Sequence, residues 1–163
     1  MEYYKNQLDD HDQKVYEMLL IGMKKRKSNI SIPLPHSDFC KIVEFIEMDH
    51  PEIFYVEFNR TRYRQSSFSI QYECHYLYTK NEVQTFQKEM EDWRQYFIKR
   101  QPPNLSVPQL YLWLHDCITY NTTYGNFEKK ESYNLRGLIH DHVSVCEGIS
   151  KAYKYLCAAF PQL

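Results

Sequence analysis

Glycine is scarce in this sequence, and its scarcity excludes two classes of nucleotide-binding protein. The 163 residues contain 4 glycines, at Gly22, Gly125, Gly137 and Gly148. No two of them have the spacing of a dinucleotide-binding fingerprint or of a P-loop, in which glycine lets the backbone approach phosphate closely. The sequence therefore predicts no phosphate-binding loop of either type.

An excess of one charge and long hydrophobic runs are also lacking. The 20 Lys and Arg residues nearly balance the 21 Asp and Glu residues, for a formal net charge of −1. No overall basic field would therefore attract nucleic acid or an anionic membrane. The N-terminus is acidic and polar, and the longest apolar stretch, around Met18 to Met23, is too short to span a bilayer. We expect a cytoplasmic protein with no cofactor and with neither a membrane nor a nucleic acid as partner.

Paired cysteines are absent as well. The chain has five scattered cysteines with no C-x-x-C pair: Cys40, Cys74, Cys117, Cys146 and Cys157. An odd, unpaired set is typical neither of a disulfide framework nor of a zinc ribbon. The sequence favours a reducing compartment, in which one thiol could serve for its reactivity.

Hydrophobic periodicity predicts an α+β fold that is mostly helical. Helices are expected over 8–27, from the N-cap Ser37 to before Pro51, from Thr79 to before Pro102, and from the N-cap Ser106 through Ile118. A polar loop is expected over 121–135. The Pro102-Pro103 break divides the chain into an N-terminal accessory region, residues 1–101, and a shorter helical part, residues 102–163.

The accessory region is expected to contain a β-hairpin between its second and third helices. Ile53 to Phe58 is rich in β-branched and aromatic residues, and apolar and polar residues alternate from Phe68 to Tyr76, a pattern typical of antiparallel strands with one buried face. Arg60, Arg62 and Arg64 alternate in the link. Such a row is more typical of the solvated side of a strand than of a nucleic-acid surface.

The segment around Cys146 carries the strongest chemical signal. Ser144 and Glu147 stand three apart, directly before an apolar set at helical spacing, and this pattern predicts a helix with Ser144 as N-cap. Cys146 would then lie in the first turn beside unpaired N–H groups, which favour a thiolate and can stabilise an oxyanion. The plainer alternative is that Cys146 is a small buried side chain.

Two segments carry a family resemblance: LYLWLHDCITYN at 110–121 and HVSVCEGISKAYKYLC at 142–157. They resemble the first half of a transglutaminase-like domain of the papain-like superfamily, in the order Leu114-His115-Asp116, Tyr120, then Ser144 to Gly148. DHPEIFYV and YLYTKNEVQTFQKEM resemble segments that precede this domain in many members. The resemblance implies that Cys146 attacks a glutamine side-chain amide or a peptide bond and forms a thioester.

The resemblance also implies a histidine and then an aspartate in a β-lobe that follows the cysteine helix. The sequence has no histidine after His142, so neither partner can be assigned, and we expect an N-terminal portion that is inactive by itself. His115 and His142 are candidate nearby polar groups, and a His142–Cys146 dyad is an open alternative. No metal is expected, because His140, His142 and Cys146 lack a fourth ligand and a recognised zinc spacing. Transglutaminase, deamidase and protease activities all stay open.

A non-catalytic interaction module is the second hypothesis. The helix from Cys146 to Phe160 would pack against a sheet that this sequence does not contain. Its apolar face would then be covered by a second copy of the chain or by another protein.

Overall fold

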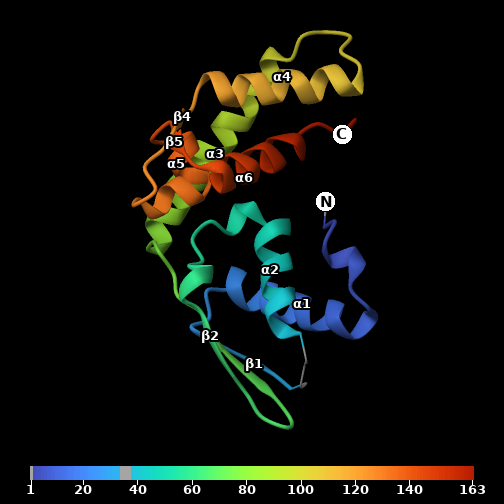
Figure 1. The fold of residues 1–163 in the computed structure, drawn as a ribbon, viewed down its shortest axis with the longest axis vertical. Coiled ribbons are helices and arrows are strands. Elements are labelled where there is room, and N and C mark those ends of the chain that lie inside the picture. The colour runs from blue at the N-terminus through green and yellow to red at the C-terminus, as the bar shows by residue number, and fades with distance from the viewer. Residues whose placement is uncertain (1, 34–37) are drawn as a thin grey trace. The chain divides into compact units, whose positions relative to one another are not determined.

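Residues 2–33 and 38–163 are described by a computed structural model (Figure 1). They form an α+β fold, which confirms the predicted class, and divide into two compact units, Met1–Thr79 and Lys80–Leu163. The division predicted at Pro102 grouped the long helix α3 (Lys80–Arg100) with the N-terminal region, whereas α3 belongs to the second unit, where it contacts α5 (Leu135–Ile139). In the described part of the chain, no helix is long and apolar enough to cross a membrane.

The first unit combines two helices with a three-stranded antiparallel sheet. Its elements are α1 (Asp10–Lys24), β1 (Asn29–Ile32), α2 (Phe39–Asp49), β2 (Arg62–Gln65) and β3 (Ile70–Glu73), with 3-10 helices at Lys5–Gln7, Pro51–Ile53 and Phe58–Arg60. The strand order is β1-β3-β2. The N-cap Ser37 predicted for α2 lies outside the described residues.

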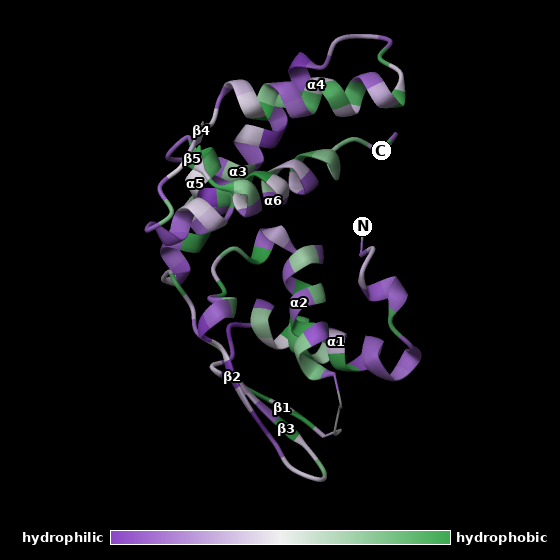
Figure 2. Cartoon of the chain, viewed as in Figure 1, coloured by the Kyte–Doolittle hydropathy of each residue, from purple (hydrophilic) through white to green (hydrophobic). Residues whose placement is uncertain are grey.

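One face of this sheet is buried under the two helices. The inward residues of β1 and β3 alternate with exposed ones and are Ile30, Ile32, Ile70 and Tyr72. The α2 ring of Phe39 lies 5.5 Å from the β3 ring of Tyr72, and α1 contacts β1. The alternation predicted over 68–76 is therefore confirmed for β3. Strand β2 is exposed along its length and hydrophilic in Figure 2, and it carries Arg62 and Arg64.

The strand predicted over Ile53 to Phe58 is wrong. This segment holds the end of one 3-10 helix, a turn, a single bridge from Val56 to Tyr76, and the start of another 3-10 helix. Ile53, Phe54, Tyr55 and Val56 are all buried, whereas a strand with one solvated face would expose every second residue. The β-branched and aromatic side chains of this segment fill the core instead of forming a strand. Strand β3 pairs with β1 and β2.

The second unit is mainly helical. Besides α3 and α5 it contains α4 (Val107–Tyr120), β4 (Thr123–Tyr124), a 3-10 helix at Lys130–Tyr133, β5 (Val143–Ser144) and α6 (Cys146–Cys157). Three predicted helix boundaries are confirmed: α3 begins after Thr79, α3 ends before Pro102, and Ser106 caps α4 in a capping box with Gln109. The predicted loop over 121–135 instead contains β4 and the 3-10 helix.

The core of the second unit includes the apolar face of α6. Ala152 and Leu156 of α6 are buried, as is Phe160 just after the helix, and α6 contacts both α4 and α5. The sequence predicted that a second copy of the chain or another protein would cover this face, whereas helices of the same unit pack against α6.

A buried carboxylate holds the start of the first unit. Asp49, at the end of α2, accepts hydrogen bonds from the backbone N–H groups of Tyr4 and Lys5 at 3.1 and 2.9 Å and from the Tyr16 hydroxyl at 3.2 Å. Burial, followed by the charge of Asp49, raises the pKa of Tyr16, so this phenol remains a donor. One side chain thereby joins three segments that are distant in sequence.

Replacing this carboxylate tests its role. We expect Asp49→Ala to lower the free energy of unfolding by about 2–4 kcal/mol, because it removes the acceptor of two part-buried backbone N–H groups and of the buried Tyr16 hydroxyl. Tyr16→Phe removes a single donor and should cost about 1 kcal/mol. Urea-induced unfolding measures both, and equal losses in the two variants would contradict this role of Asp49.

Candidate active site

Helix α6 begins one residue later than its sequence pattern predicts. Its N-cap is Val145, with φ −103° and ψ 176°, and Cys146 is the first helical residue. The predicted N-cap Ser144 lies in β5, and no side chain caps the helix. The Cys146 thiol is exposed. It therefore stands beside the N–H groups of a helix N-terminus, as expected, but at its first position.

The Ser144 side chain is turned into the core rather than toward the helix. Its hydroxyl is fully buried and donates to the Ser132 carbonyl oxygen at 2.9 Å. The Val145 N–H donates to the same oxygen at 3.0 Å. Ser144 cannot cap α6 because its hydroxyl is held by this second interaction, and the turn before Cys146 is thereby fixed to the 3-10 helix Lys130–Tyr133.

Gly148 is required by the closeness of this contact. A Cβ atom at position 148 would lie 2.5 Å from the Ser132 carbonyl oxygen and would also clash with the Ser144 hydroxyl. Only glycine, which has no Cβ, lets the first turn of α6 approach the Ser132 backbone so closely. Sequence reasoning did not identify Ser132, because its contribution is a backbone carbonyl, which any residue type can supply.

A short parallel pair of strands, β4 and β5, also fixes the segment directly before Cys146. Tyr124 of β4 pairs with Ser144 of β5. The Thr123 N–H donates to the His142 carbonyl oxygen at 2.8 Å, and the Gly125 N–H donates to the Ser144 carbonyl oxygen at 3.1 Å. The polar loop that follows α4 is thus joined to the residues directly before the thiol.

Glu147 forms an ion pair on the surface of α6 instead of a capping box. Its carboxylate binds the Lys151 ammonium one turn later, and that ammonium also lies 3.4 Å from the Tyr133 carbonyl oxygen. A carboxylate in the first helical turn interacts favourably with the helix dipole. Glu147 therefore stabilises the start of α6 electrostatically.

The histidines considered as partners of Cys146 are engaged elsewhere or face another part of the unit. His115 lies 3.1 Å from the Asp116 carboxylate, and His140 lies 3.0 Å from that of Glu89. His142 adopts a left-handed backbone, with φ 55°, and lines a pocket between α3 and α4. Among the described residues, none of them hydrogen-bonds to Cys146, so the His142–Cys146 dyad is not formed.

No metal site accompanies the thiol. Within residues 2–33 and 38–163, no group of three or more His, Cys, Asp or Glu side chains could hold a metal ion. The set of His140, His142 and Cys146 is accordingly not brought together as a site.

The remaining cysteines differ from Cys146 in their surroundings. Burial raises the pKa of Cys74 to about 11 and also raises the pKa values of Cys117 and Cys157. Cys40 is exposed and lies 3.6 Å from the Tyr63 hydroxyl. In the part of the chain that the structure describes, Cys146 is the exposed thiol without a hydrogen-bond partner.

No protein-family model matches the chain, and a search of the curated proteins returns no match.

The contact at Gly148 can be tested by adding the missing Cβ. We expect Gly148→Ala to lower the free energy of unfolding by about 1–3 kcal/mol, because the Ser132 carbonyl and Ser144 hydroxyl would have to move. Ser150→Ala, an exposed position on the same helix, is the matched control and should change it by less than about 0.5 kcal/mol. Urea-induced unfolding gives the free energy of unfolding of both variants. An unchanged free energy in Gly148→Ala would contradict the close approach of α6 to Ser132.

Proposed function

We propose that the unit Lys80–Leu163 is the cysteine-bearing helical part of a transglutaminase-like protein, with Cys146 as the nucleophile of acyl transfer. The observation that carries this proposal is the exposed Cys146 thiol at the first residue of a 12-residue helix, directly after a turn fixed by Ser132 and Gly148. A reactive thiol needs access to its substrate and a rigid position, and this arrangement supplies both.

The reaction starts with addition of the thiolate sulfur to an amide carbonyl carbon. Unpaired N–H groups at the start of α6 are placed to bind the negative charge that develops on the carbonyl oxygen. When this intermediate collapses, the C–N bond breaks and the nitrogen takes up a proton and leaves as ammonia or an amine. The acyl group stays on Cys146 as a thioester and then passes to an amine or to water.

Cleavage of an amide needs a group that protonates the leaving nitrogen. No imidazole or carboxylate hydrogen-bonds to Cys146 among the described residues. Our proposal is therefore that this chain acylates Cys146 only from activated donors, whose leaving group needs no proton. Turnover of amides would require the histidine and aspartate of the β-lobe that the family resemblance implies.

An activated ester tests the nucleophile directly. With p-nitrophenyl acetate at pH 7, we expect acetylation of Cys146 to be about tenfold faster than that of Cys40, because the N–H groups at the start of α6 can bind the oxyanion that forms during the reaction. Cys74, Cys117 and Cys157 should react last, since thiols with raised pKa values stay protonated at this pH. Peptide mass spectrometry at timed intervals gives the rate at each site.

Two variants make this experiment decisive. Cys146→Ser should abolish the fast phase, whereas Cys40→Ser, which removes the other exposed thiol, should leave it unchanged. Equal rates at Cys146 and Cys40 in the unmodified protein would refute an activated nucleophile.

A non-catalytic module that pairs with a second copy of the chain is the other candidate. Exposed apolar side chains on α4 favour it, since Val107, Tyr111 and Leu112 are 44%, 38% and 61% accessible. Val107 and Tyr111 are one helical turn apart and lie side by side on α4. Leu112 follows Tyr111, about 100° further around the helix, and widens the exposed apolar surface.

The oligomeric state separates this candidate from the first. If the module is the function, light scattering should give a dimer mass that Leu112→Glu converts to a monomer, because a buried unpaired charge weakens an apolar interface by several kcal/mol. Tyr120→Glu, also exposed on α4, should leave the dimer intact. A strictly monomeric protein would exclude this candidate and leave acyl transfer unaffected.

A further inference from the structure

A pocket of about 220 Å³ lies in the second unit, and Cys146 is not among the residues that line it. Its lining comes from α3, α4, the residue that follows α4, α5 and the residue before β5, and consists of Trp93, Tyr96, Phe97, Cys117, Ile118, Asn121, Leu138 and His142. None of these residues takes part in the acyl transfer proposed for Cys146.

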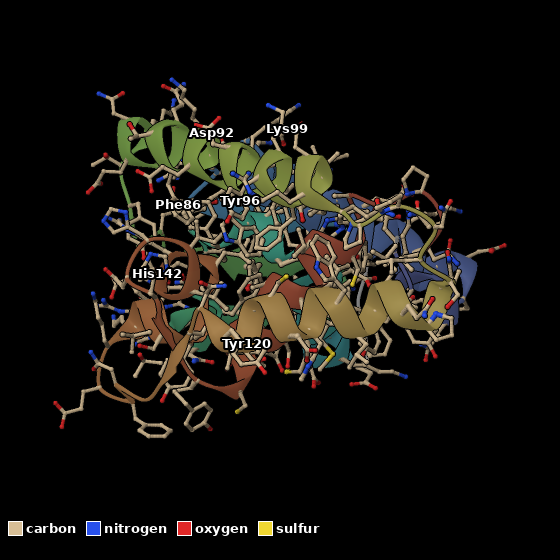
Figure 3. All side chains as sticks on the ribbon, turned by 90° about the horizontal axis from the view of Figure 1, so that it is seen from above. Phe86, Asp92, Tyr96, Lys99, Tyr120 and His142 are labelled. Atoms are coloured by element: carbon tan, nitrogen blue, oxygen red, sulfur yellow. The ribbon has the colours of Figure 1, made fainter. Side chains whose placement is uncertain are left out.

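The walls of this pocket are aromatic and apolar. The ring centroid of Phe97 lies 5.0 Å from that of Trp93 and 5.2 Å from that of Tyr96, in edge-to-face geometry. No Lys, Arg, Asp or Glu is among the lining residues. Figure 3 shows Asp92 and Lys99 on the outer side of α3, whereas Tyr96 lies on the side toward α4. Such walls favour a planar apolar guest.

Hydrogen-bonding groups stand along one part of the lining. The Asn121 amide nitrogen donates to the Cys117 carbonyl oxygen at 2.7 Å, which leaves the Asn121 side-chain oxygen as an acceptor. The His142 ring has no hydrogen-bond partner within the described residues, and its backbone is held by the bond from Thr123. Burial raises the pKa of the Cys117 thiol, so this group stays neutral.

The size and charge of the lining limit what can bind. A cavity of about 150 Å³ holds benzene, so 220 Å³ accommodates one ring with a small substituent. A cation would find no carboxylate in the lining, and the Tyr96 ring is already stacked by the Arg100 guanidinium, 3.7 Å from its centroid. An anion would have to exchange its hydration for apolar walls.

We propose that this pocket binds a small neutral aromatic molecule that carries one hydroxyl or N–H group. The ring would lie among Trp93, Tyr96 and Phe97, and its polar group would donate to the Asn121 side-chain oxygen or bond with the His142 ring. This binding site is independent of Cys146, so it stands whether or not the acyl-transfer proposal holds.

Phenol, titrated into the full chain, is the probe for this proposal. Two tryptophans give separate indole N–H signals in ¹H–¹⁵N spectra, and Trp93 lines the pocket whereas Trp113 does not. We expect a saturable shift of the Trp93 signal with an affinity on the order of millimolar, as ligand efficiency allows for so few atoms. Loss of one signal in Trp113→Phe assigns the other to Trp93.

Matched ligands and variants test each part of the pocket. Toluene, which lacks the hydroxyl, should bind about five- to tenfold more weakly than phenol, and benzoate should not bind. Tyr96→Ala should weaken phenol binding at least about fivefold, because it removes one aromatic wall. Tyr120→Ala is the control, since Tyr120 is 87% exposed and lies on the side of α4 away from α3 (Figure 3).

Several outcomes would overturn the proposal. No saturable Trp93 shift up to the solubility limit of phenol would exclude the site. Equal binding of toluene and phenol would exclude the polar contact, and this comparison uses the unmodified chain, so it does not depend on the folding of any variant. Unchanged phenol affinity in Tyr96→Ala, which replaces a half-exposed side chain, would exclude this pocket as the place of binding.

Discussion

The carbonyl oxygen of Ser132 determines where helix α6 begins. It accepts the Val145 N–H and the Ser144 hydroxyl, at 3.0 and 2.9 Å, and both donors come from the two residues before Cys146. The buried position of Ser132 makes these bonds costly to lose. Because α6 starts against this backbone, Gly148 must lack a Cβ. Cys146 lies two positions earlier, about 200° around the helix, and so remains exposed.

Burial then separates Cys146 from the other thiols of the second unit. Cys117 lies in α4 and Cys157 at the end of α6, and desolvation raises both of their pKa values. The apolar face of α6 is buried through Ala152 and Leu156, while its first residue, Cys146, is exposed. The same packing that stabilises the helix therefore leaves its N-terminal thiol accessible. In α6, the buried residues further along the helix stabilise the fold, and the first residue stays accessible to a substrate.

Elements whose ends are set by neighbouring residues could be predicted from the sequence, and elements without such local signals could not. The end of α3 and the start of α4 were predicted because Pro102 and Ser106 act on their own neighbouring residues. Strands β1 and β2 were not, since β1 is four residues long and β2 has no buried face to produce alternation.

The site itself was predicted only in part. Cys146 in the first turn of a helix came from its neighbours in the sequence, whereas the position of the N-cap did not. Ser144 has the right residue type and spacing for a cap, but its hydroxyl is bound by a carbonyl twelve residues earlier. A tertiary contact thus overrode a local preference, and the sequence does not show which backbone carbonyl accepts a hydrogen bond.

His142 belongs both to the turn before Cys146 and to the lining of the pocket. The sequence identified this histidine as a candidate polar group but did not predict this double role. The His142 carbonyl accepts the Thr123 N–H, which pairs β4 with β5 next to Cys146, while the His142 ring lines the pocket between α3 and α4. Its left-handed backbone, with φ 55°, directs these two groups to different neighbours. The backbone of His142 serves the turn before the thiol, and the residue also lines the pocket, so a substitution can separate the two features. His142→Gly would retain the carbonyl and the left-handed conformation while removing the ring.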